Sequence, residues 1–168
     1  AMGRRILHTG PLGSDSLLKV VTNYISTANL VSISEALVTA ERAGMDLSTT
    51  YESIRISSGN SFVHETESQV ILNGSRDINF TMDLVLKDIG LFDRIAQDNG
   101  VPLTVSPLLV GMFREAIEAY GPRELSPNII RRYEDPTGLD IRYPGFPADM
   151  FDDEPEDEGY EVVRGGRP

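Results

Sequence analysis

Long apolar segments separated by short clusters of glycine, asparagine and serine set the pattern of this chain. The first segment lies between Gly13 and Gly44 and places apolar or small side chains on nearly every side of a helix: Leu17, Leu18, Val21, Ile25, Ala28, Leu30, Ile33, Ala36, Leu37 and Ala40. A helix that is apolar all round is buried by neighbouring elements. We therefore predict a helix of about 30 residues, with Ser14 or Asp15 as its N-cap, that forms the central spine of the fold.

Further helices are predicted from the same combination of apolar periodicity and stop signals. They cover residues 46–56, 61–72, 81–96 and 104–120, with a short helix near 129–133, whereas only residues 5–9 indicate a short extended segment. The predicted fold class is therefore all-α, a multi-helix domain built around one long central helix. Beyond Asp135-Pro136 the prolines, glycines and acids are too dense for a core. We expect an irregular acidic tail there, with the last twenty or so residues disordered or lying along a neighbouring subunit.

Composition narrows the classes of function. The 168 residues suffice for one domain plus a tail. A formal net charge of −11 argues against nucleic-acid binding, and residues 149–161 hold eight acids and no base. Cysteine is absent and His8 and His64 are the only histidines, so we expect neither a disulfide nor a metal site. No apolar run reaches the ~20 residues that span a membrane, and no signal peptide is recognisable, so we expect a cytoplasmic protein.

Lys19 is the main candidate for chemistry, because leucine and valine pairs flank it near the start of the long helix. A lysine is rarely buried without a partner. Asn23 lies four residues later on the same helical face, so the two side chains could bind one small polar ligand. Two interpretations stay open: Lys19 exchanges a proton with a substrate hydroxyl, or its ammonium group merely reaches solvent from an apolar surface.

The spacing Gly-x-x-Gly-x-x-x-x-x-Lys-x-x-x-Asn, from Gly10 to Asn23, resembles the start of the C-terminal domain of the β-hydroxyacid dehydrogenases. That family includes 3-hydroxyisobutyrate dehydrogenase and tartronate semialdehyde reductase, and its helical domain is like that of 6-phosphogluconate dehydrogenase. A second segment agrees, because Phe80 followed by Lys87-Asp88-Ile89-Gly90-Leu91 resembles the later Phe...Lys-Asp-Leu segment of the family. The resemblance covers residues 5 to about 120.

The resemblance implies a role for each of five residues. Lys19 matches the catalytic lysine, which shares the proton of the substrate hydroxyl while hydride moves between substrate and nicotinamide. Asn23 and Phe80 match substrate-binding residues, Lys87 matches a lysine that contacts the cofactor, NAD or NADP, and Asp88 matches a supporting residue of the same cleft. Taken alone, Lys87-Asp88 would be read as a solvated charge pair and Phe80 as a core aromatic residue. No metal is implied.

Asp15 departs from the family pattern, since many members have a glycine at its position. Its carboxylate could cap the helix or pair with Lys19 four residues away, which bears on substrate preference and not on the family. Elsewhere, Arg131, Arg132 and Arg142 surround an acidic segment. They could form an anion site, but we favour a cluster of surface salt bridges.

The family keeps its nucleotide-binding fold in an N-terminal domain, and this chain has no strand-Gly-x-Gly-x-x-Gly-helix fingerprint. We therefore expect residues 1–10 to end a missing nucleotide-binding domain, 11–125 to form the helical C-terminal domain, and 126–168 to form an extension with the acidic tail. The full-length protein would be an NAD(P)-dependent dehydrogenase of a small β-hydroxy acid and a homo-oligomer, dimer or tetramer. This chain alone would be inactive. The alternative is a non-catalytic all-α dimerisation or interaction module.

Overall fold

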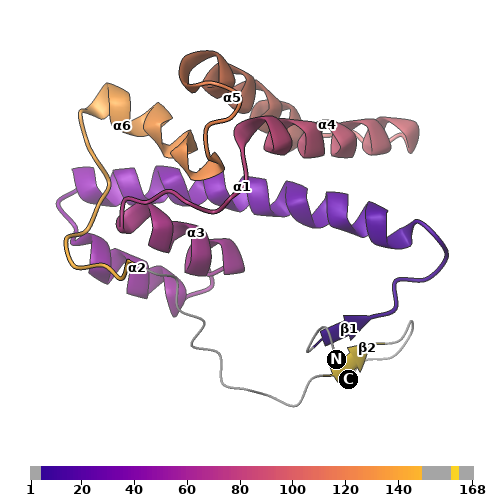
Figure 1. Ribbon diagram of the computed structural model, residues 1–168, viewed down its shortest axis with the longest axis horizontal. Helices are drawn as coiled ribbons and strands as arrows, with labels where there is room; N and C mark the ends of the chain where they lie inside the picture. The colour runs from indigo at the N-terminus through magenta and orange to yellow at the C-terminus, as the bar shows by residue number, and fades with distance from the viewer. Residues whose placement is uncertain (1–4, 149–159, 163–168) are drawn as a thin grey trace.

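The computed structural model describes residues 5–148 and 160–162, and six α-helices occupy most of that part of the chain (Figure 1). The longest is α1 (Ser14–Arg42), with 29 residues. It starts directly from a turn in which Gly13 has a φ of 92°, a left-handed conformation that glycine adopts without steric cost. Gly13 therefore occupies the N-cap position without a side-chain hydrogen bond, and the prediction that Ser14 or Asp15 caps the helix is wrong.

The shorter helices follow the predicted boundaries closely. They are α2 (Leu47–Arg55), α3 (Phe62–Leu72), α4 (Met82–Asp98) and α5 (Val105–Tyr120). Asp46 and Ser61 cap α2 and α3, because their side chains accept hydrogen bonds from the backbone N–H groups of Thr49 and His64 at 2.7 and 3.1 Å. A 3-10 helix, η1 (Ser126–Ile130), leads into α6 (Arg131–Thr137). The predicted all-α fold class is confirmed.

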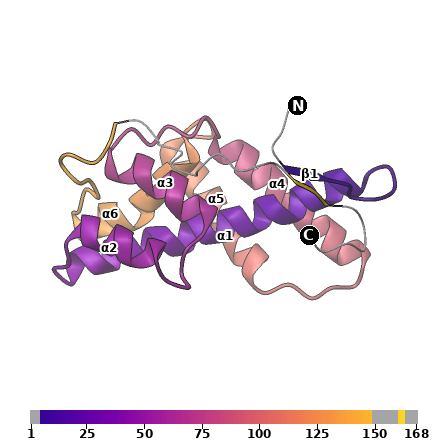
Figure 2. The ribbon, with the colours of Figure 1, turned by 90° about the horizontal axis from the view of Figure 1, so that it is seen from below.

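The helix α1 runs through the middle of the helical body (Figure 1). α4 and α5 lie on one side of it and α2 and α3 on the other, and Figure 2 shows α2 and α3 confined to its C-terminal half. The buried residues of α1 accordingly all lie between Thr27 and Val38, whereas Leu17, Leu18 and Ile25 are 45%, 41% and 49% exposed. The central spine is therefore buried over its C-terminal half only.

One hydrophobic core joins the helices to the segment that follows α6. Its fully buried side chains come from α1, α3, α4, α5, η1 and that segment, and include Leu37, Ile71, Ile89, Phe113, Ile129 and Ile141. Ile141 shows that the expectation of no core beyond Asp135-Pro136 is wrong, and Tyr143 and Phe146 also pack against the core. The dense prolines and glycines still allow individual apolar side chains to fill it.

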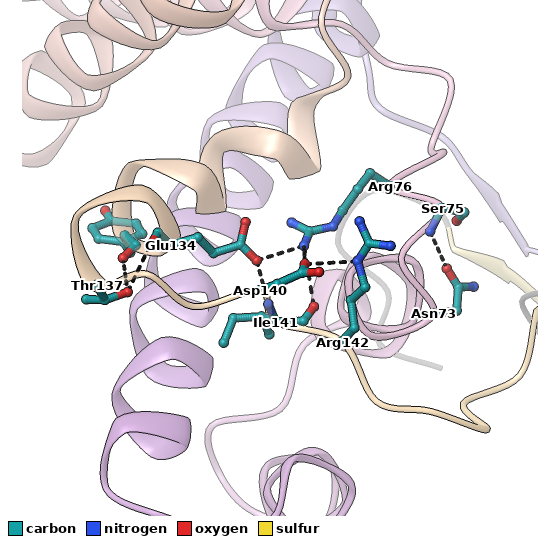
Figure 3. Close-up of polar contacts among 9 residues, drawn as sticks. Asn73, Ser75, Arg76, Glu134, Thr137, Asp140, Ile141 and Arg142 are labelled. Atoms are coloured by element: carbon teal, nitrogen blue, oxygen red, sulfur yellow. Dashed lines mark hydrogen bonds and ion pairs between the residues drawn. The ribbon is translucent and has the colours of Figure 1, made fainter.

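A buried ion pair, which we call the Arg76–Glu134 clasp, fastens this segment to the body (Figure 3). Arg76 lies in the loop after α3 and is 6% exposed, and its Nη2 lies 2.8 Å from Oε1 of Glu134 on α6. The same carboxylate oxygen accepts the backbone N–H of Ile141 at 2.7 Å. Next to it, Nε of Arg142 lies 2.9 Å from the Asp140 carboxylate. Three segments therefore meet at one carboxylate.

Two short strands complete the described structure. β1 (Arg5–Leu7) and β2 (Tyr160–Val162) pair in parallel, with Ile6 opposite Glu161. β1 confirms the short extended segment predicted within residues 5–9, whereas β2 was not expected in the tail. The rest of the expected tail, 149–159 and 163–168, lies outside the described residues. In the part of the chain that the structure describes, no helix is long and apolar enough to cross a membrane.

Candidate active site

Three polar residues form a ridge along the N-terminal half of α1. Asp15, Lys19 and Asn23 are spaced four residues apart, which places them on one face of the helix with successive Cβ atoms about 5–6 Å apart. Lys19 is exposed, and among the described residues no hydrogen bond or ion pair engages its ammonium group. Nor does any ion pair join it to Asp15. Lys19 is therefore available to a ligand.

The helix α4 packs against α1 and brings a buried carboxylate to this ridge. Asp88 is only 9% exposed, and its Oδ2 accepts a hydrogen bond from Asn23 Nδ2 at 2.6 Å. Its other oxygen, Oδ1, lies 3.3 Å from Nζ of Lys87, whose side chain is 60% exposed. Asp88 thus connects Asn23 to Lys87 and fixes the orientation of the Asn23 amide. We refer to Lys19, Asn23, Lys87 and Asp88 as the Lys19 site.

An aromatic stack holds α1 and α4 together beside this contact. The rings of Tyr24 and Phe92 stack with their centroids 4.0 Å apart and an interplanar angle of 3°. Such pairs contribute about 0.5–1.5 kcal/mol beyond the burial of their area. Sequence reasoning did not nominate these two residues, although each is an aromatic side chain close in sequence to a candidate site residue. The stack therefore packs α1 against α4 beside the Asn23–Asp88 hydrogen bond.

Phe80 lies immediately before α4 and helps to anchor its start. Its partly buried side chain packs against the core, and its carbonyl accepts a hydrogen bond from the backbone N–H of Ser126 at 2.8 Å. Asp88 lies six residues after Met82, about 9 Å along α4, and Phe80 lies two residues before the helix starts. The structure therefore brings Asn23, Lys87 and Asp88 together, places Lys19 one turn away, and leaves Phe80 beyond the start of α4.

The arginines considered as an anion site are engaged elsewhere. Arg131, Arg132 and Arg142 form separate ion pairs with Glu124, Glu115 and Asp140, at 4.0, 2.7 and 2.9 Å. The interpretation as surface salt bridges is therefore confirmed, and these pairs do not share one ligand site.

The Lys19 site combines two exposed ammonium groups with an amide that a buried carboxylate orients. The amide and ammonium groups can bind the hydroxyl and carboxylate groups of a small molecule, and a lysine in its neutral form can accept a proton. Lys87 is exposed enough to meet an anionic group of a bound nucleotide. Within residues 5–148 and 160–162, no group of three or more His, Asp or Glu side chains is placed to hold a metal ion.

Comparison with known protein families assigns the chain to one of them. Residues 13–133 match the family model described as NAD-binding of NADP-dependent 3-hydroxyisobutyrate dehydrogenase. The chain belongs to the 3-hydroxyisobutyrate dehydrogenase family. This confirms the resemblance indicated by the spacing from Gly10 to Asn23 and by the Lys87-Asp88 segment. All four members of the Lys19 site lie within the matched range.

Individual relatives agree with this assignment. The 2-(hydroxymethyl)glutarate dehydrogenase of Eubacterium barkeri is 32% identical over 142 residues, which cover 83% of this chain and 47% of that protein. The NAD-dependent L-serine dehydrogenase of Pseudomonas aeruginosa is 29% identical over 145 residues, covering 82% of this chain and 48% of that protein. The chain thus spans about half the length of the curated relatives it matches.

Solved structures of the family share the helical fold. A 3-hydroxyisobutyrate dehydrogenase from Salmonella typhimurium aligns with a TM-score of 0.66 at 26% identity, covering 71% of this chain and 42% of that chain. The Mycobacterium tuberculosis 3-hydroxyisobutyrate dehydrogenase, solved with L-serine, aligns with a TM-score of 0.67 at 21% identity, covering 74% of this chain and 45% of that chain. At 21% identity, the similarity to the Mycobacterium tuberculosis structure supports only the shared fold.

Proposed function

We propose that this chain is the helical C-terminal domain of a cytoplasmic NAD(P)-dependent oxidoreductase of small β-hydroxy acids, with Lys19 as its catalytic lysine. The observation that carries the proposal is the Lys19 site. It presents an exposed ammonium group without a partner among the described residues, beside an amide that buried Asp88 orients, in a chain of this dehydrogenase family. The relatives are dehydrogenases named for hydroxy acids, which supports the substrate class.

Proton exchange at Lys19 is the step that this chain would supply. Oxidation removes a proton from the substrate hydroxyl and a hydride from the adjacent carbon, and a bound nicotinamide supplies the hydride acceptor. Nζ of Lys19 accepts the proton as the carbonyl forms, and returns it to the substrate oxygen in the reverse direction. Asn23 and Phe80 bind the substrate, and Asp88 holds the Asn23 amide in position. Lys87 contacts the cofactor.

The domain arrangement follows from the same proposal. Residues 1–10 end an N-terminal nucleotide-binding domain, 11–125 form the helical domain, and 126–168 form its extension. Exposed apolar side chains along one half of α1, at Leu17, Leu18 and Ile25, support this arrangement. Apolar side chains gathered on one surface indicate contact with another domain or subunit. A homodimer or tetramer would bury this half of α1 further.

Hydride-transfer assays on this chain and on a full-length form with the N-terminal domain test the proposal. The full-length protein should reduce NAD or NADP with at least one small β-hydroxy acid, and this chain alone should show no turnover. Turnover by the chain alone would contradict the domain assignment. Absence of turnover by the full-length protein with both cofactors across a series of β-hydroxy acids would contradict the proposed function and favour a non-catalytic helical module.

A further inference from the structure

Asp15 is a carboxylate that no other side chain engages in the part of the chain that the structure describes. It lies in the first turn of α1, one turn before Lys19 on the same ridge, and it is exposed. Gly13 holds the N-cap position, and no hydrogen bond or ion pair of the Asp15 side chain occurs among the described residues. The carboxylate is therefore open to whatever binds at Lys19.

The charge that a substrate meets beside Lys19 depends on Asp15. The Lys87 ammonium group lies 3.3 Å from the Asp88 carboxylate, so the net charge of this pair is close to zero. Lys19 and Asp15 remain, with opposite charges and Cβ atoms about 5–6 Å apart. Without the Asp15 charge, this ridge would offer a substrate no unpaired carboxylate among the described residues. With Asp15, a second carboxylate on the substrate is repelled and an ammonium group on the substrate is attracted.

We propose that Asp15 selects the substrate by charge, so that the Lys19 site takes zwitterionic β-hydroxy acids, which carry an ammonium group, in preference to dicarboxylates. This inference rests on the proposed function, because the substrate must bind beside Lys19. One unit charge at about 7 Å changes relative rates by about 3- to 50-fold, for effective dielectric constants from that of water to that of a protein surface. Added salt reduces the effect, because exposed charges are screened.

Three probes that share a hydroxymethyl group and differ in charge test this inference in the full-length protein. They are L-serine, a zwitterion, 3-hydroxypropionate, a monoanion, and 2-(hydroxymethyl)glutarate, a dianion. Wild type should give its highest kcat/KM with L-serine. Asp15→Asn keeps the size of the side chain and removes its charge, so it should lower the kcat/KM ratio of L-serine to the dianion by at least about 3-fold. Glu118→Gln, which removes an exposed carboxylate from α5, should leave that ratio unchanged.

Lys19→Ala distinguishes a failure of the charge selection by Asp15 from a failure of the proposed function. If Lys19→Ala abolishes turnover but Asp15→Asn leaves the ratio unchanged, the charge selection is wrong and the proposed function stands. A wild-type preference for the dicarboxylate, or no turnover with any of the three probes, also overturns the charge selection. Turnover that survives Lys19→Ala overturns the proposed function, and the inference about Asp15 with it.

Discussion

The charged side chains near the two halves of α1 differ in their exposure to solvent. Around the C-terminal half, the charges of Arg76 and Glu134 are buried and paired inside the chain. Along the N-terminal half, the ammonium groups of Lys19 and Lys87 are exposed. Removing the partner of a buried ion destabilises the folded state, because the remaining charge is left unpaired. An exposed ammonium group stays hydrated and can exchange its water for a ligand. The comparison indicates that stability and ligand binding depend on different charges in this domain.

Breaking the Arg76–Glu134 clasp should have the largest effect on stability. Glu134→Ala leaves the buried guanidinium group without its partner and removes the acceptor for the backbone N–H of Ile141, so we expect a loss of about 3–5 kcal/mol. Glu134→Gln keeps an acceptor oxygen and should lose less. Denaturant unfolding of the chain measures both free energies. A loss below about 1 kcal/mol for Glu134→Ala would show that the clasp is unimportant for folding.

Glu67 should make the stability of the domain decrease as the pH rises from 4.5 to about 7. Burial raises the pKa of its carboxyl group from 4.5 to about 7, and no hydrogen bond reaches its Oε2 among the described residues. The folded state therefore holds a proton that the unfolded state releases. The corresponding stability is present below pH 4.5 and is lost as the pH rises through about 7, a change on the order of 3 kcal/mol.

The variant Glu67→Gln mimics the protonated carboxyl group and should remove this dependence. Unfolding free energies at pH 5 and pH 8 should differ in the wild type and agree more closely in Glu67→Gln, with the variant more stable at pH 8. Glu118→Gln, at an exposed position, is the matched control. An identical pH dependence in Glu67→Gln and wild type would show that Glu67 is not the group responsible.

His64 should give a smaller effect with the opposite sign. The residue is 1% exposed, its Nε2 donates to the Tyr51 carbonyl at 2.9 Å, and its Nδ1 contacts the Ser68 hydroxyl at 3.0 Å. Burial lowers the pKa of His64 below 6.5, so its contribution to stability is present above pH 6.5 and is lost as the pH falls through the folded-state value. In His64→Gln the loss of stability between pH 7 and pH 5 should shrink. Urea titrations at the two pH values test this, and an unchanged loss would contradict it.

The Asn23–Asp88 hydrogen bond should contribute least to stability among these contacts. A double-mutant cycle of Asn23→Ala and Asp88→Ala should give a coupling energy of about 1 kcal/mol in denaturant unfolding. Turnover of the full-length protein should fall in both single variants, because Asp88 orients the Asn23 amide. A coupling energy near zero would mean that the two side chains do not depend on each other.

Much of the helical architecture could be predicted because its signals are local. Asp46 and Ser61 mark helix starts through their own side chains, and Gly44 marks a helix end with a φ of 79°. Each signal acts within a few residues, so the sequence contains it directly. The candidate residues Lys19 and Asn23 could be nominated for the same reason, because both lie within one helical ridge.

The contacts between distant segments could not be predicted in this way. Asn23 and Asp88 are 65 residues apart in sequence, and Arg76 and Glu134 are 58 apart. Only the packing of whole helices decides which side chains meet over such separations. The burial of Ile141 was missed for the same reason, since a polar, proline-rich segment contributes one fully buried apolar side chain to a core that other elements build.

Lys19→Ala in the full-length protein tests the central claim most directly, when turnover and unfolding are measured on the same sample. Lys19 is exposed and has no side-chain partner among the described residues, so the free energy of unfolding should stay within about 0.5 kcal/mol of wild type. Turnover should fall by about 10²- to 10⁴-fold, the usual contribution of a proton-transferring group, while substrate binding is largely kept. Wild-type turnover in Lys19→Ala would contradict the claim that this lysine is catalytic.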